Sequence, residues 1–126
     1  MKCVYLNVKD GKTAEVREIK DDLQEFYKLI DCRCIDIVNR KIGHKRFDII
    51  CDDEGLFTDS PKISAIDNLG EPMLVGNLII VGTPDGESEE LKGLTDKEAE
   101  YVLERIQKMY TRKYPEGYYM LTQCEY

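Results

Sequence analysis

The run MLVGNLIIVG, residues 73–82, is the most apolar stretch of the chain and the best guide to its fold. Pro72 precedes the run, and the turn-forming residues TPDGE follow it. An apolar run of this length between turn signals predicts a central strand that is buried on both faces. Gly76 interrupts the run, which predicts a bulge or a close approach of another backbone segment.

Two β-rich segments upstream, CRCIDIVNR (32–40) and RFDIICD (46–52), flank the connection KIGHK. Their composition and the glycine between them predict a β-hairpin. Successive side chains of a strand point to opposite faces. In the second strand one face then carries Phe47, Ile49 and Cys51, and the other carries Asp48, Ile50 and Asp52.

The N-terminal segments CVYLNV (3–8) and TAEVREI (13–19) also alternate, and the pair Asp10-Gly11 between them predicts another hairpin. The next segment, DDLQEFYKLIDC, predicts an amphipathic helix, with Asp21 and Gln24 as its capping box. Its apolar side chains recur at helical spacing. They are Leu23, Phe26, Tyr27 and Ile30.

A second helix is predicted over residues 96–113, with Thr95 as its N-cap and Glu98 at the third helical position. Residues 55–72 mix turn residues with isolated apolar ones, so we expect an irregular segment with a short helical turn after Pro61. The C-terminal residues 114–126 predict a turn and a last strand. The sequence therefore predicts one α+β domain over residues 1–126. We expect a mixed or antiparallel sheet of five or six strands, with two helices packed on one face.

The composition limits the function classes. The chain has 126 residues and a net charge of −7, which disfavours binding to a nucleic-acid backbone. No apolar run is long enough to span a bilayer, and the N-terminus does not look like a signal peptide. We expect a cytoplasmic protein with no membrane partner. The cysteines are odd in number and show no recurring spacing, which indicates apolar residues in a reducing compartment. They are Cys3, Cys32, Cys34, Cys51 and Cys124.

The order of features over residues 51–82 resembles a small uncharacterised domain family of phages, plasmids and mobile elements of Firmicutes. The family shows an acid-acid-glycine turn after a strand, then a proline, then a glycine-bounded apolar strand. The matching residues, within a resemblance that covers about residues 20–82, are Asp53, Glu54 and Gly55 for the turn, Pro61 for the proline, and Gly76 and Gly82 for the strand.

This chain departs from the family pattern at two places. Asp52 stands where the family usually has Asn, and Lys62 with Ile63 follows Pro61 where the family has another Asn. Ligand contacts made by those asparagines therefore do not carry over. The resemblance implies a genomic setting and no established activity.

Three constellations suggest chemistry. Consecutive carboxylates at Asp52, Asp53 and Glu54 suggest a divalent metal, but neighbouring side chains on an extended chain diverge, and the segment lacks the spacing of an EF-hand. The Cys-x-Cys pair at 32–34 lacks the second ligand pair of a zinc site. His44 is the sole histidine and falls in a basic hairpin loop, where a general base is unexpected. We expect no cofactor, no metal and no catalytic residue.

Charge is unevenly distributed along the chain. One basic group surrounds the tip of the second hairpin, and residues 85–104 carry eight acids and two lysines. Solvated surface explains both groups, and contact surfaces are the functional alternative. The basic candidates are Arg40, Lys41, His44, Lys45 and Arg46, and the acidic candidates are Glu87, Glu89, Glu90, Asp96 and Glu100.

These features favour a non-enzymatic accessory or binding protein of a phage or mobile element. We expect it to act by protein–protein contact with an unknown partner, perturbing a host or defence protein. A nucleic-acid-binding module that uses residues 40–46 is one alternative. A small enzyme that depends on carboxylates or a metal near Asp52 is the other.

Overall fold

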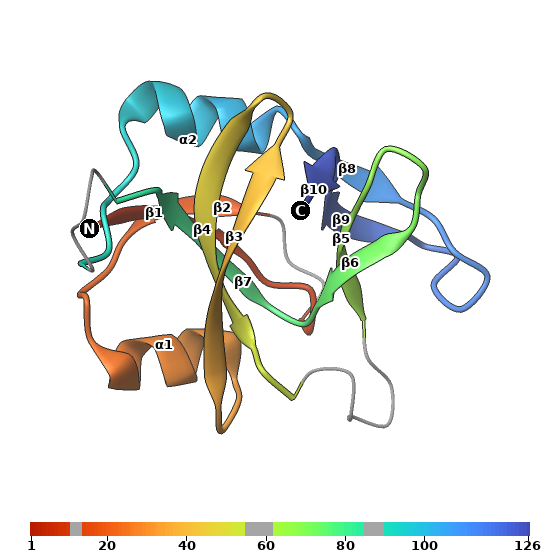
Figure 1. The fold of residues 1–126 in the computed structure, drawn as a ribbon. Helices are drawn as coiled ribbons and strands as arrows, with labels where there is room; N and C mark the ends of the chain where they lie inside the picture. The colour runs from red at the N-terminus through yellow and green to blue at the C-terminus, as the bar shows by residue number, and fades with distance from the viewer. Residues whose placement is uncertain (11–13, 55–61, 85–89) are drawn as a thin grey trace.

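The computed structural model contains two helices and two β-sheets, and it describes residues 1–10, 14–54, 62–84 and 90–126 (Figure 1). One sheet has six strands in the order β10-β3-β4-β7-β1-β2, and the other has four in the order β6-β5-β9-β8. The α+β class is confirmed. The helices are α1 (Leu23–Ile30) and α2 (Asp96–Leu103), and the strands are β1 (Lys2–Leu6), β2 (Glu15–Glu18), β3 (Ile35–Ile42), β4 (Lys45–Asp52), β5 (Ile63–Ile66), β6 (Pro72–Val75), β7 (Leu78–Gly82), β8 (Ile106–Met109), β9 (Tyr118–Leu121) and β10 (Cys124–Glu125).

The helices cover opposite faces of the six-stranded sheet, so the expectation that they share one face is wrong (Figure 1). Alternate residues of the central strands are apolar on both faces, and each face therefore needs a cover. Phe26 and Ile30 of α1 pack with Ile79 on one face. On the other face, Val102 of α2 joins the larger core cluster with Ile80.

The apolar run 73–82 forms two strands that belong to different sheets, and it is not the single strand that we expected. Gly76 lies between β6 and β7 with a φ of 78°, and its N–H donates to the Lys62 carbonyl at 2.9 Å. The positive φ lets the chain turn from one sheet into the other at a glycine, which has no Cβ to obstruct it. The prediction of a buried strand is confirmed for β7, whose five residues are all buried.

The segment after Pro61 contains a strand where we expected irregular chain and a helical turn; Pro61 itself lies outside the described residues. β5 pairs antiparallel with β6 and parallel with β9. Its Ser64 and Ala65 are fully buried. β5 has only four residues, so its alternation of apolar side chains is too short to predict a strand from the sequence.

The second helix begins as predicted but ends at Leu103, ten residues before the expected end at residue 113. The capping box of Thr95 and Glu98 is present. At the other end, the N–H and the hydroxyl of Thr122 both donate to the Arg105 carbonyl at 2.7 Å. The chain then continues as β8, which pairs with β9 along all four residues. Tertiary pairing therefore overrides the helical spacing of the apolar residues here.

The hairpins follow the predictions more closely. β1 pairs antiparallel with β2, although the turn at residues 11–13 lies outside the described part of the chain. β3 and β4 pair from Ile35 with Asp52 to Ile42 with Lys45, so the connection is only Gly43-His44. The cap of α1 is Asp22, which accepts from the Gln24 N–H at 2.9 Å, and not Asp21. Neither described helix is long and apolar enough to cross a membrane.

Candidate functional site: a groove between β3 and β6

A groove of about 320 Å³ lies where the two sheets meet on the face of the large sheet that α2 also covers. β3 lines it with the alternate residues Asp36, Val38 and Arg40, so one face of this strand forms a wall. β6 lines it with four successive residues, Pro72 to Val75, so the edge of that strand forms the opposite wall. The remaining lining residues are Cys51, Asp52, Asp53 and Tyr126.

Arg40 gives the groove a cation at one end. Its Nη1 donates to the Asn39 carbonyl at 3.0 Å, and its Cζ lies 4.7 Å from the centroid of the Tyr126 ring. Its Nε is buried and has no hydrogen-bond partner, and no described carboxylate forms an ion pair with the guanidinium. A buried donor without an acceptor costs about 1–3 kcal/mol. Arg40 therefore carries a charge that no described carboxylate neutralises.

The opposite end of the groove is acidic. Asp36 accepts from the Ile37 N–H at 2.9 Å, and Asp52 accepts from the Glu54 N–H at 2.9 Å. Both carboxylates are thus oriented by the local backbone. Among the residues that the structure describes, no group of three or more His, Cys, Asp or Glu side chains is arranged to hold a metal ion. The three consecutive acids from Asp52 to Glu54 do not converge.

Cys51 contributes a thiol to the wall of the groove, and the pKa values of this and three other thiols are raised by burial. Burial raises the pKa of Cys51 to about 12, and Asp36 beside it acts in the same direction. Burial likewise raises the pKa of Cys124 to about 11. The same cause raises the pKa values of Cys3 and Cys32 to about 11. These four thiols stay protonated at neutral pH, which disfavours a nucleophilic thiolate.

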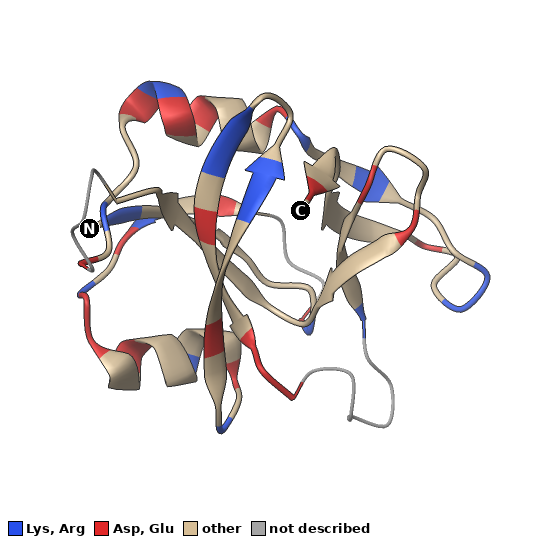
Figure 2. Ribbon diagram, in the orientation of Figure 1, with Lys and Arg blue, Asp and Glu red and all other residues tan. Residues whose placement is uncertain are grey.

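The predicted basic residues of β3 and β4 lie near one end of the β3–β4 hairpin (Figure 2), but their side chains make different contacts. Arg40 lines the groove, and the hairpin tip lies against α2. The Tyr101 hydroxyl accepts from the His44 N–H at 2.7 Å, and the Lys45 Nζ lies 3.1 Å from Glu98 Oε2. Arg46 donates to Asn39 Oδ1 at 3.1 Å and to the Tyr126 carbonyl at 3.0 Å. The tip is therefore docked on the protein rather than presented as one free basic patch.

Gly43 allows this docking because the turn approaches α2 closely. A Cβ at Gly43 would collide with the Tyr101 hydroxyl and would lie 2.6 Å from Arg105 Nε. The Arg105 guanidinium stacks on Tyr101, with its Cζ 3.5 Å from the ring centroid. The β3–β4 turn, the Tyr101 ring and the Arg105 guanidinium thus pack against one another.

The predicted acidic residues are dispersed. Asp96 accepts a hydrogen bond from Lys2 Nζ, which lowers the pKa of Asp96. Glu100 is exposed on α2, and Glu90 is engaged in an interaction. Glu87 and Glu89 lie outside the described residues. The Lys45–Glu98 ion pair joins the basic hairpin tip to α2, and Glu98 is not among the predicted acidic candidates.

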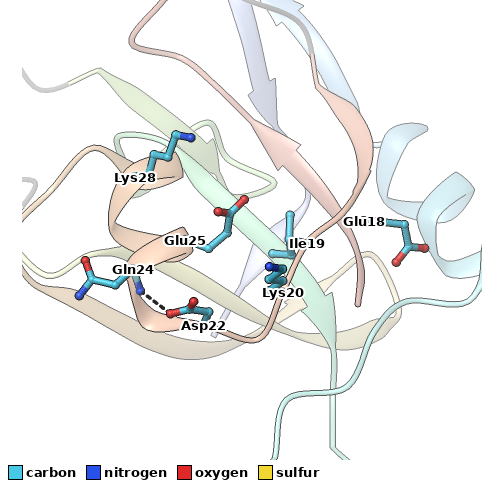
Figure 3. Close-up of a pocket in the computed structure, with 7 residues that line it drawn as sticks. All are labelled: Glu18, Ile19, Lys20, Asp22, Gln24, Glu25 and Lys28. Carbon is cyan, nitrogen blue, oxygen red and sulfur yellow. Dashed lines mark hydrogen bonds between the residues drawn. The ribbon is translucent and has the colours of Figure 1, made fainter.

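Another cavity, of about 510 Å³, lies between α1 and the chain that follows β2 (Figure 3). Ile19 is its single apolar lining residue. Most of its polar lining residues are solvent-exposed, and Asp22 is held in the helix cap by its bond with the Gln24 N–H. Ligand sites combine apolar walls with a few convergent polar groups, and the β3–β6 groove fits that description better.

The sequence identified Arg40, Asp52 and Asp53 as candidates but assigned them to separate surfaces. It missed Tyr126 and the edge of β6. The alternation of Asp36, Val38 and Arg40 on β3 was a visible signal for one wall. No local signal places residues 72–75 or 126 opposite that wall, since these contacts join distant parts of the chain.

Comparison with known protein families matches residues 1–111 to a domain of unknown function, DUF3846. The chain belongs to the DUF3846 family. The expectation of an uncharacterised domain family is confirmed at this level, over a longer segment than residues 20–82. Every lining residue of the groove except Tyr126 falls within the DUF3846 match. No curated protein and no solved structure matches the chain.

Proposed function

We propose that this DUF3846 protein is a non-enzymatic binding protein that acts by protein–protein contact through the β3–β6 groove. The observation that carries the proposal is the contact between Arg40, which forms no ion pair with a described carboxylate, and Tyr126, which is 75% exposed. Arg and Tyr are enriched among the residues that dominate binding energy in protein interfaces. The apolar wall of Val38, Met73 and Leu74 supplies contact area between the charged ends.

The biological setting is part of the same proposal. The resemblance over residues 51–82 supports an accessory role in a phage or mobile element, directed at a host or defence protein. The free cysteines support a reducing cytoplasmic location.

The nucleic-acid alternative receives less support. Lys45 is paired with Glu98, and Arg46 is bonded to Asn39 and to the Tyr126 carbonyl. The net charge of −7 opposes a polyanion as well. The carboxylate-enzyme alternative is weakened by the divergence of the acids from Asp52 to Glu54.

Affinity capture with matched variants tests the proposal. The immobilised protein is incubated with nuclease-treated lysate of the cells that produce it, alongside Tyr126→Ala, Leu74→Glu and the control Glu100→Lys. We expect one protein to be retained by the native chain and by Glu100→Lys but lost from both groove variants. Titration of that purified protein then gives the affinity of each variant.

Two results would overturn the proposal. In one, every retained protein binds the groove variants as tightly as the native chain. In the other, a protein is retained from untreated lysate but not from nuclease-treated lysate, which would favour the nucleic-acid alternative.

A further inference from the structure

The β3–β6 groove combines an open strand edge with a charged strand face, and these two walls together define a ligand. We propose that the groove binds an extended segment of a partner protein, which pairs antiparallel with β6 and carries the pattern basic-x-apolar-x-acidic. This inference rests on the proposed function and specifies the chemistry of the partner.

The edge of β6 supplies the backbone half of the site. β6 is the terminal strand of the four-stranded sheet, and within the described residues it pairs with β5 alone. Its four successive residues line the groove, so the unpaired edge faces the cavity. Addition of an extended peptide to such an edge is a recurrent mode of recognition. Pro72 has no N–H to donate, so the pairing falls on Met73 to Val75.

The face of β3 supplies the side-chain half. Asp36, Val38 and Arg40 follow one another at every second residue, in the order acidic, apolar, basic. Four residues of strand separate the two charges, a distance of about 13 Å. A peptide strand that lies along this wall presents its own alternate side chains to it. Its complementary pattern places a basic, an apolar and an acidic residue at alternate positions.

The polarity of the peptide follows from the position of Gly76. This residue follows β6 directly, and a Cβ built on it would lie 4.0 Å from the Cβ of Asp52. The C-terminal end of β6 therefore lies at the acidic end of the groove. A strand that pairs antiparallel with β6 enters at the acidic end and leaves at the Arg40 end, so its basic residue comes first. Antiparallel pairing is also the slightly more stable arrangement per residue.

The charged ends supply the specificity. The guanidinium of Arg40 is free of described carboxylates, so an incoming carboxylate forms a charge-assisted pair with it. The Tyr126 ring lies over the same guanidinium, with the Arg40 Cζ 4.7 Å from its centroid. A peptide of reversed sequence would bring like charges together at both ends.

Designed peptides of equal composition test the inference by fluorescence anisotropy. The heptapeptides TKTVTET and TETVTKT carry the same residues in opposite order, with a fluorophore on each. We expect the native chain to bind TKTVTET about tenfold more tightly than TETVTKT, the ratio that one charge-assisted pair provides. Arg40→Glu should lose that affinity and recover it with TKTVTKT. Asp36→Lys should lose it and recover it with TETVTET.

Asp36 is exposed on β3, so Asp36→Lys keeps the test valid even if Arg40→Glu unfolds. Hydrogen exchange gives a second test, which measures backbone pairing and does not depend on the charges of the peptide. Bound TKTVTET should slow the hydrogen exchange of at least one amide among Met73, Leu74 and Val75, and leave the amides of the buried strand β7 unchanged.

Equal affinity for the two peptides, no binding of either at millimolar concentration, or unchanged exchange in β6 would overturn the inference. A partner that the groove variants release in the capture experiment would leave the proposed function standing in each of these cases. If the peptides bind as expected but no partner depends on the groove, the proposed function fails by itself.

Discussion

The docking of the β3–β4 turn on α2 gives the sharpest stability prediction, which concerns Gly43→Ala. Gly43 has a φ of 62°, and alanine in this left-handed region costs about 1–2 kcal/mol. The added Cβ also displaces Tyr101 and Arg105. Loss of the bond between the His44 N–H and Tyr101 costs about 1 kcal/mol. Partial loss of the Arg105–Tyr101 stack costs about 0.5–1 kcal/mol more.

We therefore expect Gly43→Ala to lower the free energy of unfolding by about 3 kcal/mol. Gly70→Ala is the matched control. Gly70 has a φ of 81°, but nothing lies within 4 Å of a Cβ built on it. In this control the free energy of unfolding should fall only by the cost of placing alanine in the left-handed region, about 1–2 kcal/mol. Urea unfolding followed by circular dichroism measures the free energy of unfolding of both variants. In thermal unfolding, at roughly 4 °C per kcal/mol, the melting temperature should fall by about 12 °C for Gly43→Ala and by about 6 °C for Gly70→Ala.

A double-mutant cycle separates the clash from the backbone strain. In a Tyr101→Ala background the obstacle at Gly43 is reduced, so Gly43→Ala should cost about as much as Gly70→Ala does. If Gly43→Ala and Gly70→Ala have the same cost in the native background, within about 0.5 kcal/mol, the docked turn makes no energetic contribution and the reasoning is refuted.

Three other predictions follow from the caps and the thiols. Thr95→Ala should lower the free energy of unfolding by about 1 kcal/mol because the N-cap of α2 is lost, whereas Thr95→Ser keeps it; urea unfolding distinguishes them. In the native protein, Cys34 should react with a thiol reagent within minutes because it is exposed, whereas Cys51 and Cys124 should react only at the rate of unfolding, as mass spectrometry of the labelled protein would reveal. In reducing buffer, the free energy of unfolding should fall as the pH rises from about 9 toward 11, because unfolded thiols ionise while folded Cys51 and Cys124 remain protonated. The fall is at most about 1.4 kcal/mol per pH unit for each thiol. A flat profile over this range, or one that Cys124→Ala does not make shallower, would contradict the assigned burial of these thiols.

Local signals predicted the parts of the fold that depend on neighbouring residues. The capping box of Thr95 and Glu98 located the start of α2. The alternation of residues 46–52 correctly divided the side chains of β4 between two faces, with Phe47 in one core cluster and Ile50 in the other. In both cases the decisive contacts lie within a few residues or across a short hairpin.

The second sheet was harder to predict because its strands have only four residues each, and β5 and β9, which pair in its centre, lie far apart in the sequence. β5 pairs with β9 through Ala65 and Leu121. The apolar residues of β8 also fit a helix, and only the pairing with β9 decides between the two structures. The groove depends on the same long-range contacts. The charge of Arg40 was recognised, but its contact with Tyr126 is a property of the folded chain.

The family match ends at residue 111, and the structure places two strands beyond that point. β9 lies between β5 and β8, so it joins the two halves of the four-stranded sheet. It also carries Leu121 into the main core cluster. A fragment cut at the family boundary would leave β8 without its partner and expose the main core cluster. The matched segment therefore lacks strands that complete the second sheet and the main core, and fragments of this protein should retain the C-terminal residues 112–126.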